Sequence, residues 1–113
     1  MTRNKFSVAH QNKLAILLKM EKTITLNLPH DLSDSEQKKV FNVYEQMNGW
    51  LDGYEVPYWF GTEKDEQYIY ASVEPSGLLL CGKIDESIWI GWITVLCAKL
   101  SLALGKEIHD AES

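Results

Sequence analysis

Two strand-like segments flank a tight turn between residues 68 and 84, and this feature constrains the fold more than any other. The segments read YIYASVE and GLLLCGKI. Between them, Glu74-Pro75-Ser76-Gly77 matches a type I turn, because proline pre-sets φ at the second position and glycine is favoured at the fourth. The sequence therefore predicts a β-hairpin and, with it, an antiparallel sheet.

Side chains in the first of these strands alternate between two faces of the sheet. One face is apolar and is predicted to enter the core: Ile69, Ala71 and Val73. The other face is aromatic and polar, and is predicted to remain available for recognition: Tyr68, Tyr70, Ser72 and Glu74. A register shift of one residue would exchange the two sets.

Two helices are expected, one before and one after the hairpin in the sequence. Ser33 stands three residues before Glu36, which is the spacing of a capping box. Apolar residues then recur at helical spacing and predict one buried face: Val40, Val43, Tyr44, Met47, Trp50 and Leu51. Asp85 is predicted to cap the second helix, which runs to about Leu104 and is closed by Gly105.

Further strands are expected over residues 22–28, which alternate polar and apolar side chains, and over residues 55–61, where Pro57 suggests a sheet edge. Residues 106–112 form either a short edge strand or a tail. The resulting order, β-α-β-β-β-α with an optional final strand, predicts an α+β fold. We expect a mostly antiparallel sheet of about four strands with two helices on one side.

The chain is expected to contain one domain preceded by a basic extension. Residues 1–20 hold four basic side chains and no acid, and their apolar run LAILL is too short for a secretion signal. This extension is predicted to be frayed or helical, unless Met20 is the true start. Residues 21–113 form the predicted single α+β domain.

The net charge of the chain indicates which classes of partner it can bind. The formal net charge is −5, so residues 21–113 carry −9 once the four bases of the extension are set aside. A field of this sign repels nucleic acid and anionic membranes and attracts cationic partners. Cys81 and Cys97 both lie in apolar runs, where cysteine serves as a small buried side chain. A reducing cytoplasmic location is therefore expected.

The segment from Ile88 to Leu104 contains a single charged residue, Lys99, so a membrane span has to be considered. It is short for a bilayer and lacks flanking basic clusters, and we therefore expect a core helix. Its predicted buried residues are Trp89, Trp92, Ile93, Leu96, Leu100 and Leu104. Another side carries a stripe of small residues that permits close packing: Gly91, Thr94, Ala98 and Ser101.

The sequence contains no recognisable catalytic or metal-binding motif. His10, His30 and His109 lack a second ligand at helical spacing, and neither cysteine has an activating basic neighbour in the sequence. His109-Asp110 could form a dyad, although a solvated pair is the simpler interpretation. We therefore expect no enzyme activity, no catalytic residues, no metal and no cofactor.

A protein-binding surface is the function that these residues favour instead. Acidic and aromatic side chains gather in segments predicted to be neighbours, where aromatics supply binding energy and acids steer a basic partner. The predicted binding residues are Glu55, Tyr58, Glu63, Asp65, Glu66, Tyr68, Tyr70 and Glu74. Tyr54 and Trp59 lie in the same region, although Trp59 could belong to the core.

The second half of the chain also resembles a known class of proteins. The residues concerned are Trp59-Phe60-Gly61, the segment from Tyr68 to Leu80, the tryptophan-rich helix, Leu104-Gly105 and Asp110-Ala111-Glu112. Together they resemble small bacterial immunity proteins of contact-dependent growth inhibition and polymorphic-toxin systems. The resemblance implies a cytoplasmic protein that binds a cognate toxin's C-terminal domain, often a nuclease, and blocks its active site.

An alternative from a different class is a small-molecule-binding or self-associating regulatory domain. In that case the apolar helix over residues 88–104 would line a pocket or a dimer interface. The expected oligomeric state is a monomer or a weak homodimer. Neither hypothesis requires direct binding to nucleic acid or membrane.

Overall fold

The computed structural model describes residues 21–112, which form two helices and one five-stranded sheet. The elements are β1 (Lys22–Leu26), α2 (Asp34–Gln46), β2 (Trp50–Leu51), β3 (Tyr58–Trp59), β4 (Tyr68–Glu74), β5 (Gly77–Lys83) and α3 (Glu86–Leu104). The predicted α+β class is confirmed, with one strand more than expected. The predicted extension over residues 1–20 lies outside the described residues.

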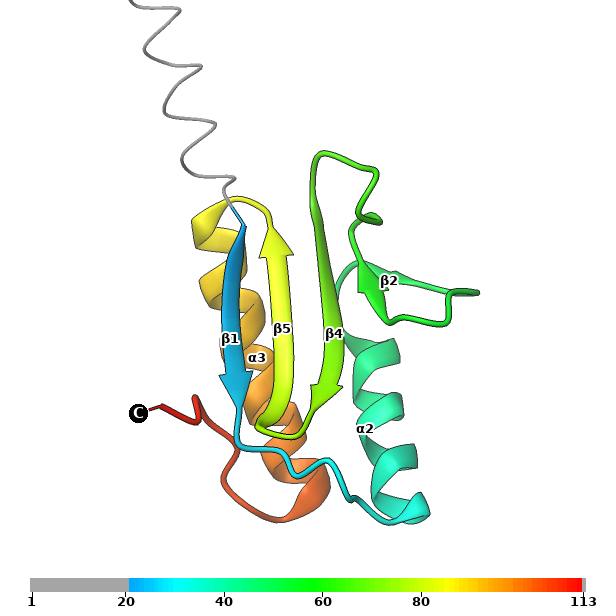
Figure 1. The fold of residues 1–113 in the computed structure, drawn as a ribbon, viewed down its shortest axis with the longest axis vertical. Coiled ribbons are helices and arrows are strands. Elements are labelled where there is room, and N and C mark those ends of the chain that lie inside the picture. Colours follow the sequence, from blue (N-terminus) through cyan, green and yellow to red (C-terminus); the bar gives the residue numbers. More distant parts are fainter. Residues whose placement is uncertain (1–20, 113) are drawn as a thin grey trace, which may run out of the picture.

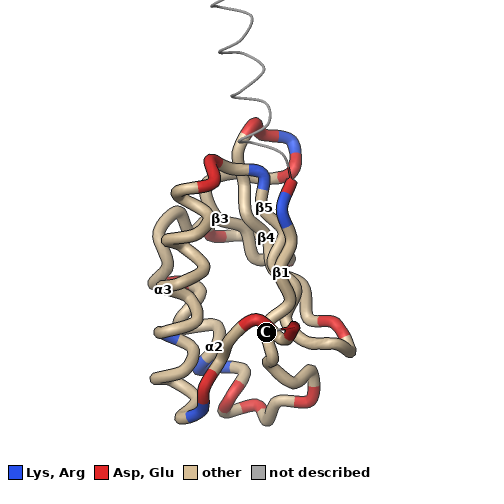
Figure 2. Tube along the Cα trace, turned by 90° about the vertical axis from the view of Figure 1, so that its left-hand side faces the viewer, with Lys and Arg blue, Asp and Glu red and all other residues tan. Residues whose placement is uncertain are grey.

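All strand pairs in the sheet are antiparallel, and the spatial order is β1-β5-β4-β3-β2. β4 and β5 form the predicted hairpin, in which Glu74 pairs with Gly77. Both helices lie on the same side of the sheet, so the domain has two layers (Figures 1 and 2). The other face of the sheet is left open by the described elements, and this open face positions the candidate site.

The predicted helix caps are confirmed. Ser33 and Glu36 make both hydrogen bonds of the capping box at the start of α2. Asp85 accepts a hydrogen bond from the Ser87 backbone N–H at the start of α3, and Gly105 closes that helix with φ 69°. The first helix is nevertheless shorter than expected, because Gly49 follows it with φ 88° and turns the chain. The helical assignment of Trp50 and Leu51 was therefore wrong, since both belong to β2.

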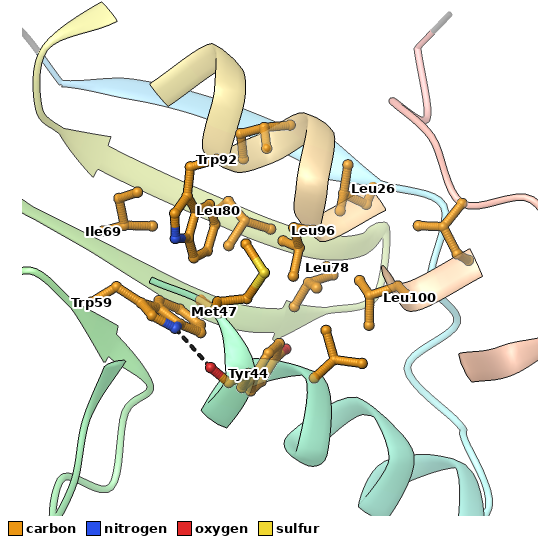
Figure 3. Packing of buried hydrophobic residues seen from close by; sticks show 14 of the residues in the cluster. Leu26, Tyr44, Met47, Trp59, Ile69, Leu78, Leu80, Trp92, Leu96 and Leu100 are labelled. Carbon is orange, nitrogen blue, oxygen red and sulfur yellow. Dashed lines mark hydrogen bonds between the residues drawn. The ribbon is translucent and has the colours of Figure 1, made fainter. Parts of the chain in front are cut away.

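The core lies between the helices and the sheet and is built around Trp59 (Figure 3). Trp59 is 0% exposed, and its Nε1–H donates a 2.9 Å hydrogen bond to the Tyr44 carbonyl oxygen. Its ring packs against Trp92 of α3 with a centroid distance of 4.8 Å. Leu80 from the sheet and Leu96 from α3 are likewise fully buried. The possibility that Trp59 is a core residue is thus confirmed.

Two details of the predicted sheet are corrected by the structure. Pro57 does not mark an edge, because β3 lies between β2 and β4. Val73 was expected in the core with Ile69 and Ala71 but is 59% exposed, although those two are buried. The reason is that Val73 borders an open groove beside α2, so the helix layer does not reach the end of β4.

The C-terminal segment returns to β1 without forming a regular final strand. Leu26 and Asp110 make an isolated antiparallel bridge. The Asn27 backbone N–H donates to the His109 carbonyl at 3.1 Å, and the Ala111 N–H donates to the Thr25 carbonyl at 2.8 Å. Asn27 also binds this segment through its side chain. The optional final strand is therefore reduced to a bridge that covers part of the β1 edge.

Helix α3 is the only helix in the described residues that is long and apolar enough to cross a membrane by length and composition. Its inner side is buried as predicted through Trp89, Trp92, Ile93, Leu96 and Leu100, whereas Leu104 is half-buried. Its outer side remains apolar, and Leu102 is 86% exposed. Most of the predicted small-residue stripe also lies exposed on that side, namely Gly91, Thr94 and Ala98.

Candidate functional site

The open face of the sheet carries a row of four tyrosines. Tyr58 of β3 lies directly across from Tyr70 of β4. Tyr68 lies two residues before Tyr70, on the same side of β4. Tyr54 extends the row from the loop before β3. The ring centroids are 5.6 Å apart for Tyr54 and Tyr58, and 6.2 Å apart for both Tyr58–Tyr70 and Tyr68–Tyr70. These four residues are called the tyrosine face.

A carboxylate is hydrogen-bonded to a hydroxyl in each half of the tyrosine face. The Tyr58 hydroxyl donates to Glu63 Oε1 at 2.8 Å, and the Tyr68 hydroxyl donates to Glu21 Oε2 at 2.8 Å. Both glutamates are exposed residues. An ionised carboxylate has about four acceptor positions, so each glutamate can accept further hydrogen bonds from a partner. The face thus combines a row of aromatic rings with oriented acceptors.

The hydroxyls of Tyr58, Tyr68 and Tyr70 stay protonated at neutral pH, because the surroundings of each raise its pKa. Hydrogen bonding to Glu63 raises the pKa of Tyr58. Burial, followed by the hydrogen bond to Glu21, raises the pKa of Tyr68 to about 12. Hydrogen bonding with the Cys81 side chain, together with burial, raises the pKa of Tyr70. The negative charge of this surface therefore comes from its carboxylates rather than from its phenols.

The structure brings together four of the predicted binding residues, namely Tyr58, Glu63, Tyr68 and Tyr70. Tyr68 differs from the expectation in one respect, because its side chain faces the open side but is only 7% exposed. It supports its neighbours and leaves Tyr54, which is 53% exposed, as a larger contact surface. Apart from Val73, which is exposed, the division of β4 into core and outer faces is as predicted from the alternation.

The remaining predicted residues lie away from the centre of the tyrosine face. Glu55 and Glu66 are exposed in loops, and Glu74 is half-buried at the hairpin, where it accepts a hydrogen bond from the Ser72 hydroxyl. Asp65 has a structural contact, because its carboxylate accepts a 2.8 Å hydrogen bond from the Thr62 backbone N–H. Figure 2 shows acidic residues gathered in the loop between β3 and β4, at one end of the sheet.

Sequence reasoning missed Glu21, which precedes β1 and binds a tyrosine 47 positions later. No periodic pattern connects two residues so far apart. The only available signal was the strand pattern starting at Lys22, because a strand paired with β5 brings its preceding residue close to the start of β4.

A second surface lies beside α3, where a groove of about 320 Å³ runs between the end of α2 and α3. Met47 and Trp92 line it together with the exposed side chains of Ile88 and Val95. Phe60 stands at this groove with a left-handed backbone, φ 70°, which is uncommon for a non-glycine residue. Its N–H donates a 2.7 Å hydrogen bond to the Gly49 carbonyl, which holds this conformation in place.

Reactive groups elsewhere in residues 21–112 are placed for structure. No cluster of three or more potential metal ligands occurs in this part of the chain. Burial raises the pKa of the Cys81 thiol despite an opposing hydrogen bond from Tyr70, and burial also raises the pKa of Cys97. Both effects disfavour the reactive thiolate. His109 Nδ1 lies 2.8 Å from the Asp110 backbone oxygen, and the His109 backbone N–H donates to Asn27 Oδ1 at 2.8 Å, which holds the C-terminal segment against the end of β1.

No family model, curated protein or solved structure matches the chain. Two surfaces of the described domain can therefore be considered for function on their own chemistry. One is the tyrosine face with its carboxylates, and the other is the apolar groove with the outer side of α3.

Proposed function

We propose that this protein is a bacterial immunity protein that binds a toxin domain through the tyrosine face and thereby blocks the toxin's active site. The observation that carries this proposal is the open sheet face, on which Tyr58 and Tyr70 pack together beside the carboxylates of Glu21 and Glu63. Such a surface suits a protein partner because aromatic rings bury large area with little loss of side-chain entropy. The proposed location is the cytoplasm.

The charge of the domain suggests which toxins it would fit. A nuclease holds an anionic substrate, so its active-site cleft is commonly basic. An acidic surface can occupy such a cleft and exclude the nucleic acid, and the opposite charges also accelerate encounter. The net charge of −9 over residues 21–113 supports this pairing.

The first experiment is co-purification with the product of the gene immediately upstream. We expect a stoichiometric complex with that product's C-terminal domain, and we expect the domain to kill cells that lack the present protein. Rescue by coexpression would establish protection. Absence of both complex and toxicity would contradict the proposal.

Charge reversal tests the binding face. Replacing Glu63, Glu66 and Glu74 with lysine is expected to slow association with the toxin domain by about 10-fold or more at low salt, because long-range attraction is lost. Asp65 is left unchanged because it holds its own loop. Stopped-flow fluorescence would measure the rate.

The matched control for this variant is Glu45→Lys, since Glu45 is an exposed acid on α2, in the helix layer across the sheet from the tyrosine face. Because Glu45→Lys reverses a single charge, it is compared with Glu63→Lys alone, and it should change association much less than that single replacement. Equal rates for the wild type and the triple variant would remove the acidic surface from the binding mechanism.

The apolar surface of α3 favours a second candidate function, that of a self-associating or small-molecule-binding regulatory domain. Ile90 and Leu102 are exposed on this helix, and the neighbouring groove has a volume of about 320 Å³. Contiguous apolar patches on soluble proteins often mark interaction sites. A weak homodimer through this surface would leave the tyrosine face accessible.

Replacing both Ile90 and Leu102 with glutamine is expected to abolish any such dimer with little effect on folding, because both side chains are exposed. Sedimentation velocity over a range of concentrations would detect the change. A wild-type protein that remains monomeric and takes up no apolar dye would contradict this candidate.

A further inference from the structure

We propose that the tyrosine face recognises arginine, with the rings of Tyr54, Tyr58 and Tyr70 contacting a guanidinium group while Glu63 accepts its N–H donors and Glu21 adds negative charge to the same face. This inference rests on the proposed role of the face in binding a basic protein. It adds the kind of side chain that the partner inserts.

The arrangement of the rings provides the first argument. Tyr54 and Tyr58 meet edge to face at an interplanar angle of 82°, and Tyr58 and Tyr70 meet at 64°. Rings at such angles present both edges and faces to an approaching group. A flat guanidinium stacks on an aromatic face and is attracted by its negative quadrupole. Tyr54 is exposed, and Tyr58 and Tyr70 are half-buried, so all three retain accessible surface.

The position of the carboxylates provides the second argument. Glu63 is fixed by the Tyr58 hydroxyl, and Glu21 is fixed by the Tyr68 hydroxyl. Each hydrogen bond restricts a side chain that would otherwise lose more rotamer freedom on binding. Charge-assisted hydrogen bonds from arginine to such carboxylates are stronger than bonds between neutral groups.

The charges around the tyrosine face indicate where on it a guanidinium group is most favoured. The charges of Glu21 and Glu63 both contribute to raising the pKa of Tyr70, so their fields overlap at that residue. The basic residue Lys83 on β5 pairs directly with Tyr68 and is exposed. It disfavours a second cation at the Tyr68 end. A guanidinium is therefore best placed at the Tyr58–Tyr70 end, beside Glu63.

Arginine fits this surface better than lysine does. The guanidinium is planar, weakly hydrated and able to donate five hydrogen bonds in a fixed geometry, whereas the ammonium of lysine is compact and strongly hydrated. A surface that only attracts positive charge would bind both equally. A surface that uses its rings should discriminate between them.

The test is a titration of the full-length isotope-labelled protein with hexa-arginine and, separately, hexa-lysine at low salt, followed by amide chemical shifts. We expect hexa-arginine to bind about threefold more tightly. The largest shifts should fall on β3, β4 and the loop between them. Equal affinities for the two peptides, or shifts spread over all acidic surfaces, would overturn the proposal.

Variants separate the contribution of the rings from that of charge. The double change Tyr54→Leu with Tyr58→Leu should remove the preference for arginine while leaving weak binding of both peptides. Tyr58→Phe keeps the ring but loses the hydrogen bond to Glu63, so it should retain the preference while binding both peptides more weakly. Circular dichroism would show that the double variant is folded. Glu45→Gln on α2 should leave the preference unchanged. A preference that survives the double leucine change would assign it to another surface.

These results are independent of the proposed toxin. Absence of an arginine preference would leave toxin binding possible through other contacts. Absence of a toxin complex, with the preference intact, would leave an arginine-binding surface for a different basic protein.

Discussion

Replacing Trp59 with alanine is expected to lower the free energy of unfolding by about 3–5 kcal/mol, as is typical for loss of a large buried aromatic. Domains of this kind have a total stability of about 5–15 kcal/mol, so the variant should be close to unfolding at physiological temperature. Urea denaturation followed by tryptophan fluorescence and circular dichroism would measure the change. A loss below about 2 kcal/mol would contradict the central role of this side chain.

The reason lies in how many elements meet at Trp59. Its ring contacts Tyr44 of α2 at 5.2 Å, Trp50 of β2 at 5.6 Å and Trp92 of α3 at 4.8 Å, as measured between ring centroids. Removing it would open a cavity between both helices and the sheet. The control is Trp59→Phe, which retains an aromatic ring but loses the hydrogen bond to the Tyr44 carbonyl. Its stability should be intermediate.

Gly77→Ala is the second substitution with a large expected effect, a loss of roughly 3 kcal/mol in unfolding free energy. Gly77 has φ 138°, and a Cβ atom there would lie 2.2 Å from the Leu26 carbonyl oxygen of the neighbouring strand. Backbone cannot move aside as a side chain can, so β1 and β5 would have to separate locally. Thermal and urea unfolding would quantify the loss.

Gly53→Ala is the matched control for this substitution. Gly53 has φ 90°, but a Cβ atom there meets nothing within 4 Å. Its replacement should cost only about 1 kcal/mol, through backbone strain alone. Equal losses for the two variants would mean that backbone conformation, and not the close approach of β1, determines the effect at Gly77.

Local patterns predicted the elements whose signals are local. The turn from Glu74 to Gly77 specifies the hairpin, and Ser33 with Glu36 specifies the start of α2, because these interactions involve residues close in sequence. The end of α2 was harder to predict. Trp50 continues the apolar spacing of the helix, yet it belongs to the sheet, where it is partly buried by packing on Trp59. Apolar spacing alone cannot distinguish a residue that packs on the core from a helix from one that packs on it from a strand.

Sequence patterns also could not predict how much of the sheet the helix layer covers. Alternation correctly assigned Ile69 and Ala71 to the inner face, but it could not indicate where the helix layer ends, and Val73 lies beyond that point. In the candidate site, too, some contacts were predictable from the sequence and others were not. The segments that carry Tyr58 and Tyr70 were predicted to be neighbours, whereas the hydrogen bond between Glu21 and Tyr68 depends on the pairing of β1 with β5.

The pairing of β1 with β5 has a consequence for synthesis of the protein. Lys22 pairs with Gly82, so β1 leaves the ribosome long before its partner has been made. At about 5–20 residues per second, the delay is roughly 3–12 s. During that interval neither β5, which pairs with the edge of β1, nor α3, which packs on its apolar side, has been made. Thr23 and Thr25 alternate with apolar residues, so one face of the unpaired strand stays polar. This limits premature pairing with other nascent chains.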